Sequence, residues 1–197
     1  MASKKINLAV LISGSGSNLQ ALIDACARDD FPARIAVVLS NKGDAFGLTR
    51  AQKAGIPTEV ISHKDHDGRE PFEAAIIKAL TPYEPDLICL AGFMRILTPH
   101  FINHWGAQRM INIHPSLLPD YKGLNTHQRA IDDDKDTAGC TVHFVAPEVD
   151  SGEIITQKQV PIHPDDTAET LAKRVLVQEH IAYPEAVERV AKTLLPQ

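Results

Sequence analysis

The chain has 197 residues, of which 44% are hydrophobic and 23% charged, and its formal net charge is −5 at pH 7. This length and composition predict one globular domain, residues 1–197, that buries about 70% of its unfolded surface. The acidic balance excludes a general nucleic-acid binder, which would carry a basic face, but it allows a local basic pocket for a small anion.

The cysteines predict a reducing compartment. Cys26, Cys89 and Cys140 are odd in number and each lies in an apolar segment, so buried thiols are expected rather than disulfides. The first apolar run, residues 6–12, is only long enough for a strand, so neither a signal peptide nor a membrane span is expected. These features predict a cytoplasmic protein.

The first strand leads into a glycine-rich turn. Residues 8–12 are continuously apolar, as in a central parallel strand, and Ser-Gly-Ser-Gly-Ser-Asn (13–18) precedes a helical pattern over 19–27. Strand, turn and helix in this order commonly bind a phosphate on backbone amides. The turn lacks the third glycine of a dinucleotide fingerprint and the lysine of a P-loop, which favours a mononucleotide phosphate. A tight turn without a ligand is the alternative.

The first ninety residues alternate between strands and helices. Further strands are expected at 35–39, 58–61 and 87–91, and helices between 44 and 55 and over 69–80. This alternation predicts a parallel sheet with helices on both faces.

A helix over 99–105 leads to a strand with alternating residues, Met-Ile-Asn-Ile-His (110–114). Asn112 and His114 should share one face of this strand, and Pro115 should end it. His114 then lies at the carboxyl end, where open α/β sheets bind ligands. An amide donor beside an imidazole can stabilise an oxyanion and move protons. A buried pair that only satisfies loop backbone is the alternative.

The second half mixes a helix (126–133) with two strands (140–145 and 154–160). A final helix is expected to begin at a capping box, Asp166-Thr167-Ala168-Glu169, and Pro184 should bend it or split it in two. The fold class is therefore α/β: an open, mostly parallel twisted sheet with helices on both faces and mixed strands in the C-terminal half.

Five segments carry a resemblance to known proteins: residues 11–20, 91–97, 111–119, 150–152 and 178–180. From residue 6 to about residue 190 the chain resembles the folate-dependent formyltransferase family. The Asn-x-His-Pro-Ser-Leu-Leu-Pro motif with a downstream Asp is shared by the wider family, and the Gly-Ser-Asn turn narrows the match to members that act in purine synthesis. The resemblance implies a Rossmann-like fold whose first half mainly binds a nucleotide phosphate and whose second half mainly binds folate.

The resemblance also implies an activity. The formyl group of 10-formyltetrahydrofolate, the formyl donor co-substrate, would pass to the amine of glycinamide ribonucleotide, which is a step of de novo purine (IMP) biosynthesis. No metal is implied. The expected partners are these two small molecules, with no nucleic acid and no membrane, and the chain is expected to be a monomer or a homodimer.

Residue roles follow from the same resemblance. Asn112 would donate to the formyl oxygen, His114 would transfer protons, and Asp150 would lie against His114. One set of residues would hold the ribonucleotide: Gly16, Ser17, Asn18 and Glu179. A second set, joined by the turn over 147–152, would line the folate site: Arg69, Met94, Arg95, Ile96, Leu97 and Asn112. Without the resemblance, Met94 and Leu97 would be interpreted as core filling.

The chain departs from the purine-synthesis members at two positions, with Lys122 and Asn125 where those proteins usually have Pro and His. The alternatives are formyltetrahydrofolate deformylase or another folate-dependent formyltransferase, such as the tRNA enzyme, which needs a further domain and a basic surface. A nucleotide-binding module without catalysis is the non-enzyme alternative. The combination of Asn112, His114 and Asp150 argues against it.

Overall fold

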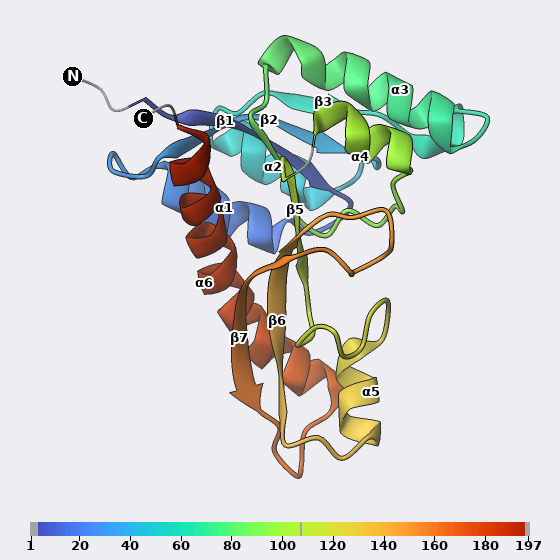
Figure 1. The fold of residues 1–197 in the computed structure, drawn as a ribbon, viewed down its shortest axis with the longest axis vertical. Coiled ribbons are helices and arrows are strands. Elements are labelled where there is room, and N and C mark those ends of the chain that lie inside the picture. The colour runs from blue at the N-terminus through green and yellow to red at the C-terminus, as the bar shows by residue number, and fades with distance from the viewer. Residues whose placement is uncertain (1–3, 107, 196–197) are drawn as a thin grey trace.

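The computed structural model describes residues 4–106 and 108–195, which form a seven-stranded sheet in the order β3-β2-β1-β4-β5-β6-β7 (Figure 1). The strands are β1 (Ile6–Ile12), β2 (Ala33–Ser40), β3 (Thr58–Val60), β4 (Leu87–Leu90), β5 (Met110–His114), β6 (Thr137–Phe144) and β7 (Ile154–Pro161). Pairs within β1–β5 are parallel, whereas β5–β6 and β6–β7 are antiparallel. The predicted fold class is confirmed.

Helices cover both faces of the sheet. They are α1 (Ser17–Cys26), α2 (Phe46–Lys53), α3 (Arg69–Leu80), α4 (Pro99–Trp105), α5 (Thr126–Asp132) and α6 (Ala168–Leu194), with 3₁₀ turns η1 (His63–Asp65) and η2 (Thr81–Tyr83). Side chains of α1, α2 and α6 share one apolar cluster with the sheet, and those of α3 and α4 share the other. Figure 1 shows α5 beside the end of β6 that lies away from α3 and α4.

The continuous apolar run of β1 follows from this layering. Leu8 and Val10 belong to the cluster under α1 and α6, while Ala9 and Leu11 belong to the cluster under α3. All four side chains are fully buried. A strand covered on both faces cannot alternate apolar with polar residues, because neither face meets water.

The last helix differs from its prediction. The sequence predicts either a bend or a split at Pro184, and the split is wrong, because α6 runs continuously from Ala168 to Leu194 with this proline inside it. Pro184 has no N–H, so the helix loses one backbone hydrogen bond there. Tyr183, Ala186 and Val187 on either side of it are fully buried in the core. Burial of these neighbours holds the helix together across the proline.

The cap of α6 also shifts by one residue from the predicted box. Thr167 is the N-cap, its hydroxyl accepts from the Thr170 amide, and the Thr170 hydroxyl accepts from the Thr167 amide. Asp166 instead accepts from Arg174 at 2.6 and 2.9 Å. The hydrogen bonds from Arg174 are the largest cause that holds the pKa of Asp166 below its ordinary value.

None of the helices within the described residues is long and apolar enough to cross a bilayer. The parallel strands all end at one edge of the sheet, so the chain leaves β1, β4 and β5 on the same side. The candidate site lies at this edge.

Candidate active site

Strand β5 presents Asn112 and His114 on the face opposite Ile111 and Ile113, as its alternation predicts. The two isoleucines are buried in the cluster beneath α6. His114 is the last residue of the strand and is only 6% exposed. Beyond it the chain turns at Pro115, whose carbonyl accepts from the Thr126 hydroxyl at 2.8 Å.

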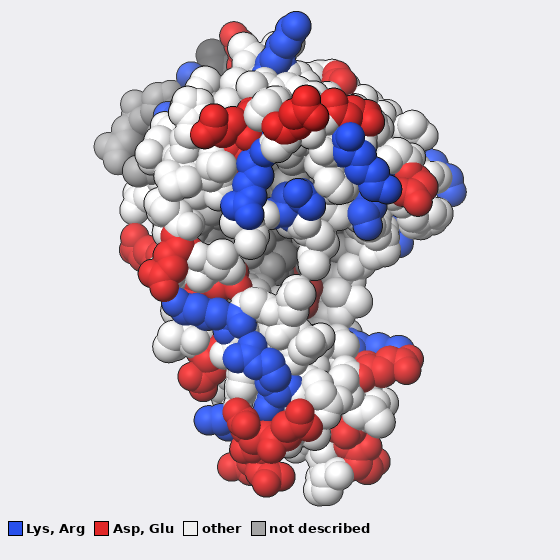
Figure 2. Space-filling view, turned by 90° about the vertical axis from the view of Figure 1, so that its right-hand side faces the viewer, with Lys and Arg blue, Asp and Glu red and all other residues white. Residues whose placement is uncertain are grey.

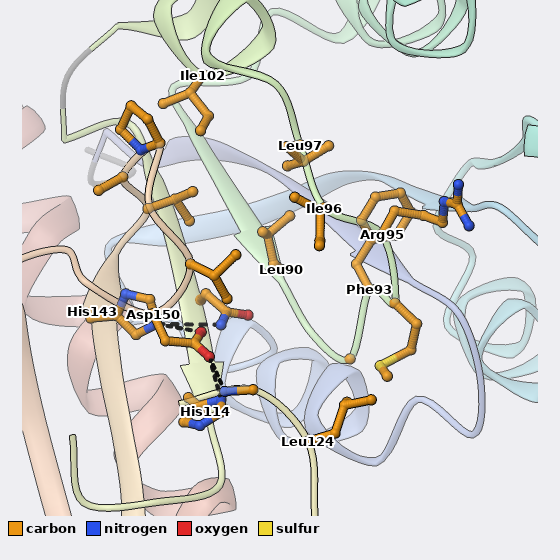
Figure 3. Close-up of a pocket in the computed structure, with 18 residues that line it drawn as sticks. Leu90, Phe93, Arg95, Ile96, Leu97, Ile102, His114, Leu124, His143 and Asp150 are labelled. Carbon is orange, nitrogen blue, oxygen red and sulfur yellow. Dashed lines mark hydrogen bonds and ion pairs between the residues drawn. The ribbon is translucent and has the colours of Figure 1, made fainter. Parts of the chain in front are cut away.

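The His114 imidazole lies between two acceptors. Its Nδ1 is 3.3 Å from Asp150 Oδ2 (Figure 3). Its Nε2 is 2.9 Å from the Tyr121 carbonyl. A doubly protonated ring would donate to both acceptors at once. The site can therefore hold a cationic imidazole without leaving either N–H unpaired.

The Asp150 carboxylate faces a backbone amide and two imidazoles. Its side chain is 9% exposed, Oδ2 accepts from the Gly123 amide at 2.9 Å, and Oδ1 is 3.7 Å from His143 Nε2. Burial raises the pKa of this carboxyl, but His143, the Gly123 amide and the charge of His114 together lower it by more. The pKa of Asp150 thus lies below its ordinary value, and the carboxylate is ionised at neutral pH.

His143 is a site residue that the sequence analysis missed. It lies on β6 directly opposite Asn112, and its Nε2 is 3.3 Å from Asn112 Nδ2. Its Nδ1 is 2.8 Å from the Phe144 carbonyl. Nδ1 carries a proton and donates to that carbonyl. In the neutral ring Nε2 therefore accepts from Asn112 and fixes the direction of the amide, whereas in the doubly protonated ring Nε2 faces Asp150 as a donor. The antiparallel pairing of β5 with β6 brings Asn112 and His143 together, and this pairing has no local sequence signal.

Asn112, His114, His143 and Asp150 line one region of a cavity of about 420 Å³ (Figure 3). Predicted folate residues also line it: Met94, Arg95, Ile96 and Leu97, with Pro147 and Val149 from the predicted turn. Leu90, Phe93, Ile102 and Val145 make much of its wall apolar. Arg69, the first residue of α3, is not part of this lining.

The predicted phosphate turn lies at the start of α1. Gly16 has a φ of +69°, and a Cβ there would lie 2.6 Å from the Gly47 Cα, so this position requires glycine. The first amide that bonds back within α1 is that of Gln20, to the Gly16 carbonyl at 2.9 Å. The amides of residues 17–19 precede this bond and can serve an anion.

Glu179 of α6 lies beside this turn. Its Oε2 accepts from Asn18 Nδ2 at 2.6 Å, and the residue is only 8% exposed. Burial raises the pKa of Glu179, and the Asn18 hydrogen bond offsets only part of that rise. Asn18 Oδ1 is buried and has no hydrogen-bond partner. The fold thus brings Asn18 and Glu179 together, although α1 and α6 lie far apart in sequence.

The two unusual residues lie in the loop before α5. Lys122 Nζ is 3.7 Å from Glu148 Oε1, next to the Gly123–Asp150 hydrogen bond, so two contacts join this loop to the turn over 147–152. Asn125 has a φ of +57° and precedes the first residue of α5. Asparagine adopts this left-handed conformation more readily than most residues, which suits it to position 125.

The net charge of −5 is unevenly distributed. Figure 2 shows one face of the molecule hollowed at mid-height, with Lys and Arg side chains above and below the hollow. Within the part of the chain that the structure describes, Arg95 is the one Lys or Arg residue in the cavity lining.

Among residues 4–106 and 108–195, no group of three or more His, Cys, Asp or Glu side chains could hold a metal ion.

Comparison with known proteins gives one consistent result. Residues 6–187 match the family described as formyl transferase. The phosphoribosylglycinamide formyltransferase of Escherichia coli (strain K12) is 48% identical over 179 residues, which are 91% of this chain and 84% of that protein. The trifunctional purine biosynthetic protein adenosine-3 of Bos taurus is 51% identical over 188 residues, and this chain spans only 18% of its length.

A solved structure agrees with the sequence comparison. The crystal structure of phosphoribosylglycinamide formyltransferase from Brucella melitensis superposes with a TM-score of 0.92 at 49% identity, covering 95% of this chain and 96% of that one.

Proposed function

The chain belongs to the formyl transferase family, and from that premise we propose that it transfers the formyl group of 10-formyltetrahydrofolate to the amine of glycinamide ribonucleotide. The product is formyl-glycinamide ribonucleotide, an intermediate of de novo purine biosynthesis. The observation that carries the proposal is the contact of Asp150 with His114 beside Asn112 in an apolar cavity. A module that only binds a nucleotide would not need Asn112, His114 and Asp150 together.

The catalytic roles follow from where charge develops. Attack of the amine on the formyl carbon places negative charge on the formyl oxygen. The Asn112 amide can donate to this oxygen, and so can a protonated His114 when its Nε2–H leaves the Tyr121 carbonyl. Asp150 stays against Nδ1 and holds the imidazole in place. His114 can then relay a proton from the attacking nitrogen towards the departing folate nitrogen. Alignment of the two substrates supplies the remaining acceleration, so no nucleophilic residue is needed.

The ribonucleotide would bind beside α1. The amides of Gly16, Ser17 and Asn18 would hold its phosphate at the helix N-terminus, where the helix dipole favours an anion. The buried Glu179 carboxyl, hydrogen-bonded to Asn18, would accept from the ribose hydroxyls or the amine. Binding would also supply polar partners for Asn18, whose Oδ1 has none.

The folate would occupy the cavity. Its volume of about 420 Å³ and its mostly apolar wall are in the range typical of small-molecule sites. Met94, Arg95, Ile96 and Leu97 would contact the ring system along one side, with the turn over 147–152 along another. Arg69 is assigned to folate by the resemblance alone, since it does not line the cavity. No metal, nucleic acid or membrane enters this reaction, which we expect in the cytoplasm of the cell.

An assay with competing acceptors tests the proposal. Purified protein is mixed with 10-formyltetrahydrofolate, with and without glycinamide ribonucleotide, and both formylated product and free formate are measured. We expect formylated ribonucleotide as the main product and little formate. Formate released at the same rate without the ribonucleotide would indicate a deformylase, and the absence of both products would favour a binding module.

A further inference from the structure

A row of side-chain hydrogen bonds crosses the carboxyl edge of the sheet in the spatial order of the strands. His63 follows β3, Asn41 follows β2, Ser13 follows β1 and Met94 follows β4. Asn41 Nδ2 lies 3.3 Å from His63 Nδ1, the Ser13 hydroxyl donates to Asn41 Oδ1 at 2.6 Å, and the Met94 amide donates to Ser13 Oγ at 2.8 Å.

The centre of this row is buried. Ser13 is 5% exposed and Asn41 is 2% exposed. The Ser13 hydroxyl therefore makes both its hydrogen bonds out of contact with bulk water, where an unpaired polar group is costly. Removing this hydroxyl would leave the Met94 amide and the Asn41 oxygen without their partner.

Ser13 joins the two candidate substrate sites. Its backbone continues into the turn that carries the amides of residues 16–18, and its hydroxyl holds the amide of Met94, a residue of the cavity lining. Met94 is 61% exposed, so its own packing does little to fix the chain at this point. The hydrogen bond to Ser13 supplies that restraint.

We propose that Ser13, oriented by Asn41, is a positioning residue that sets the place of the folate-lining segment, residues 94–97, relative to the phosphate-binding turn. This inference rests on the proposed function. The turn itself has separate supports, because the Gly14 carbonyl accepts from the Gly47 amide at 3.0 Å and the Ser15 carbonyl accepts from Arg50 Nε at 2.9 Å. Loss of the Ser13 hydroxyl should therefore affect the folate and spare the ribonucleotide.

The test compares Ser13→Ala with a matched control, Ser40→Ala. Ser40 is also a buried serine at this edge, but its hydroxyl donates to the carbonyl of Lys42 in its own loop. The dissociation constants of glycinamide ribonucleotide and of a non-reactive 10-formyltetrahydrofolate analogue are measured by calorimetry. Ser13→Ala should weaken folate binding by about tenfold and change ribonucleotide binding by less than about twofold. Ser40→Ala should leave both constants near their wild-type values.

A second variant and a ligand-free measurement complete the test. Asn41→Ala leaves the Met94–Ser13 bond in place but removes the acceptor that orients Ser13, so its effect on folate binding should be smaller than that of Ser13→Ala. In the free protein, hydrogen exchange of the Met94 amide should speed up by about tenfold in Ser13→Ala and stay unchanged in Ser40→Ala.

Unchanged Met94 exchange and unchanged folate affinity in Ser13→Ala would overturn the inference, as would equal weakening of both ligands. These outcomes differ from failure of the proposed function, in which the wild-type protein itself binds no folate while Met94 exchange still responds to Ser13→Ala.

Discussion

Asp150 Oδ2 lies 3.3 Å from His114 Nδ1, and the same oxygen accepts from the Gly123 amide at 2.9 Å. The carboxylate therefore cannot turn away from the imidazole without also breaking a backbone hydrogen bond. Asp150 has a φ of +49°, a left-handed conformation uncommon for residues other than glycine. The turn accepts this conformation while it places the carboxylate against His114.

Replacement of Asp150 by Asn tests that contact. The neutral amide keeps the shape of the side chain but cannot stabilise a protonated imidazole by charge. We expect kcat for formyl transfer to fall on the order of 100-fold, with little change in ribonucleotide affinity. Steady-state kinetics and calorimetry would measure the two effects, with exposed Asp132→Asn on α5 as control. A kcat within about twofold of wild type would reduce Asp150 to a turn residue.

The stability of the protein should depend on pH through the same carboxyl. Because the pKa of Asp150 is lower in the folded chain, its ionised form stabilises the fold above the unfolded pKa, about 3.9. That contribution is lost as the pH falls through the folded pKa. Urea unfolding between pH 6 and about pH 3 should therefore show a steeper decline for the wild type than for Asp150→Asn. Parallel declines would contradict the assignment.

A double-mutant cycle tests whether His143 acts through Asn112. Asn112→Ala should lower kcat by about 100-fold, because one donor to the oxyanion is lost. His143→Phe should lower it by about tenfold, since the amide loses the acceptor that directs it. If His143 acts through Asn112, adding His143→Phe to Asn112→Ala should cost little more. Fully additive losses would mean that His143 contributes by another route, for example through Asp150.

Glu179→Gln should separate binding from stability. Burial raises the pKa of Glu179, so its contribution to stability is complete below the unfolded pKa and is lost as the pH rises through the folded pKa. Glutamine imitates the neutral form, so we expect stability at pH 7 to be equal or higher. The KM for the ribonucleotide should rise by about tenfold, because a charged acceptor is lost. Chemical denaturation and kinetics would decide, and an unchanged KM would place the ribonucleotide elsewhere.

Gly152→Ala should disturb the turn that carries Asp150. A Cβ at residue 152 would lie 1.7 Å from the Phe144 carbonyl oxygen, so the backbone must move. We expect a loss of about 2–3 kcal/mol in unfolding free energy, with reduced kcat. Gly43→Ala, where the nearest atom is a Val60 methyl carbon at 3.8 Å, is the control. Equal stabilities of the two variants, measured by urea unfolding, would show that the backbone of the turn can move to accommodate the added methyl group at little cost.

Local signals in the sequence predicted most of the elements. The helix over 99–105 and the strand over 110–114 match their predicted bounds, because Thr98 caps a helix that begins at Pro99 and Pro115 follows the strand. Local rules failed where distant contacts outweighed them. The continuous helix across Pro184 depends on the burial of Tyr183, whose hydroxyl donates to the Leu90 carbonyl on β4 at 2.8 Å.

The sequence identified site residues only where they lie in a recognisable motif. Asn112 and His114 share a strand, so their proximity follows from spacing two residues apart. The contact of His114 with Asp150 came from the family resemblance, because no local pattern relates a turn to a strand end. His143 was missed for the same reason, since its role depends on the register of β6 against β5. Arg69 lies outside the five segments that carry the resemblance, and it does not line the cavity.

Helix α6 is synthesised after every strand of the described sheet, yet its Leu171, Val175 and Val187 complete the apolar cluster that the helix shares with β6 and β7. During translation, α1 and α2 can cover part of one face of the growing sheet, but the part over β6 and β7 lacks its cover until α6 has left the ribosome. That face is strongly apolar, and such surfaces are prone to aggregation and to capture by chaperones. Because Glu179 also lies on α6, the nascent protein completes its core and its proposed ribonucleotide site in the same late step.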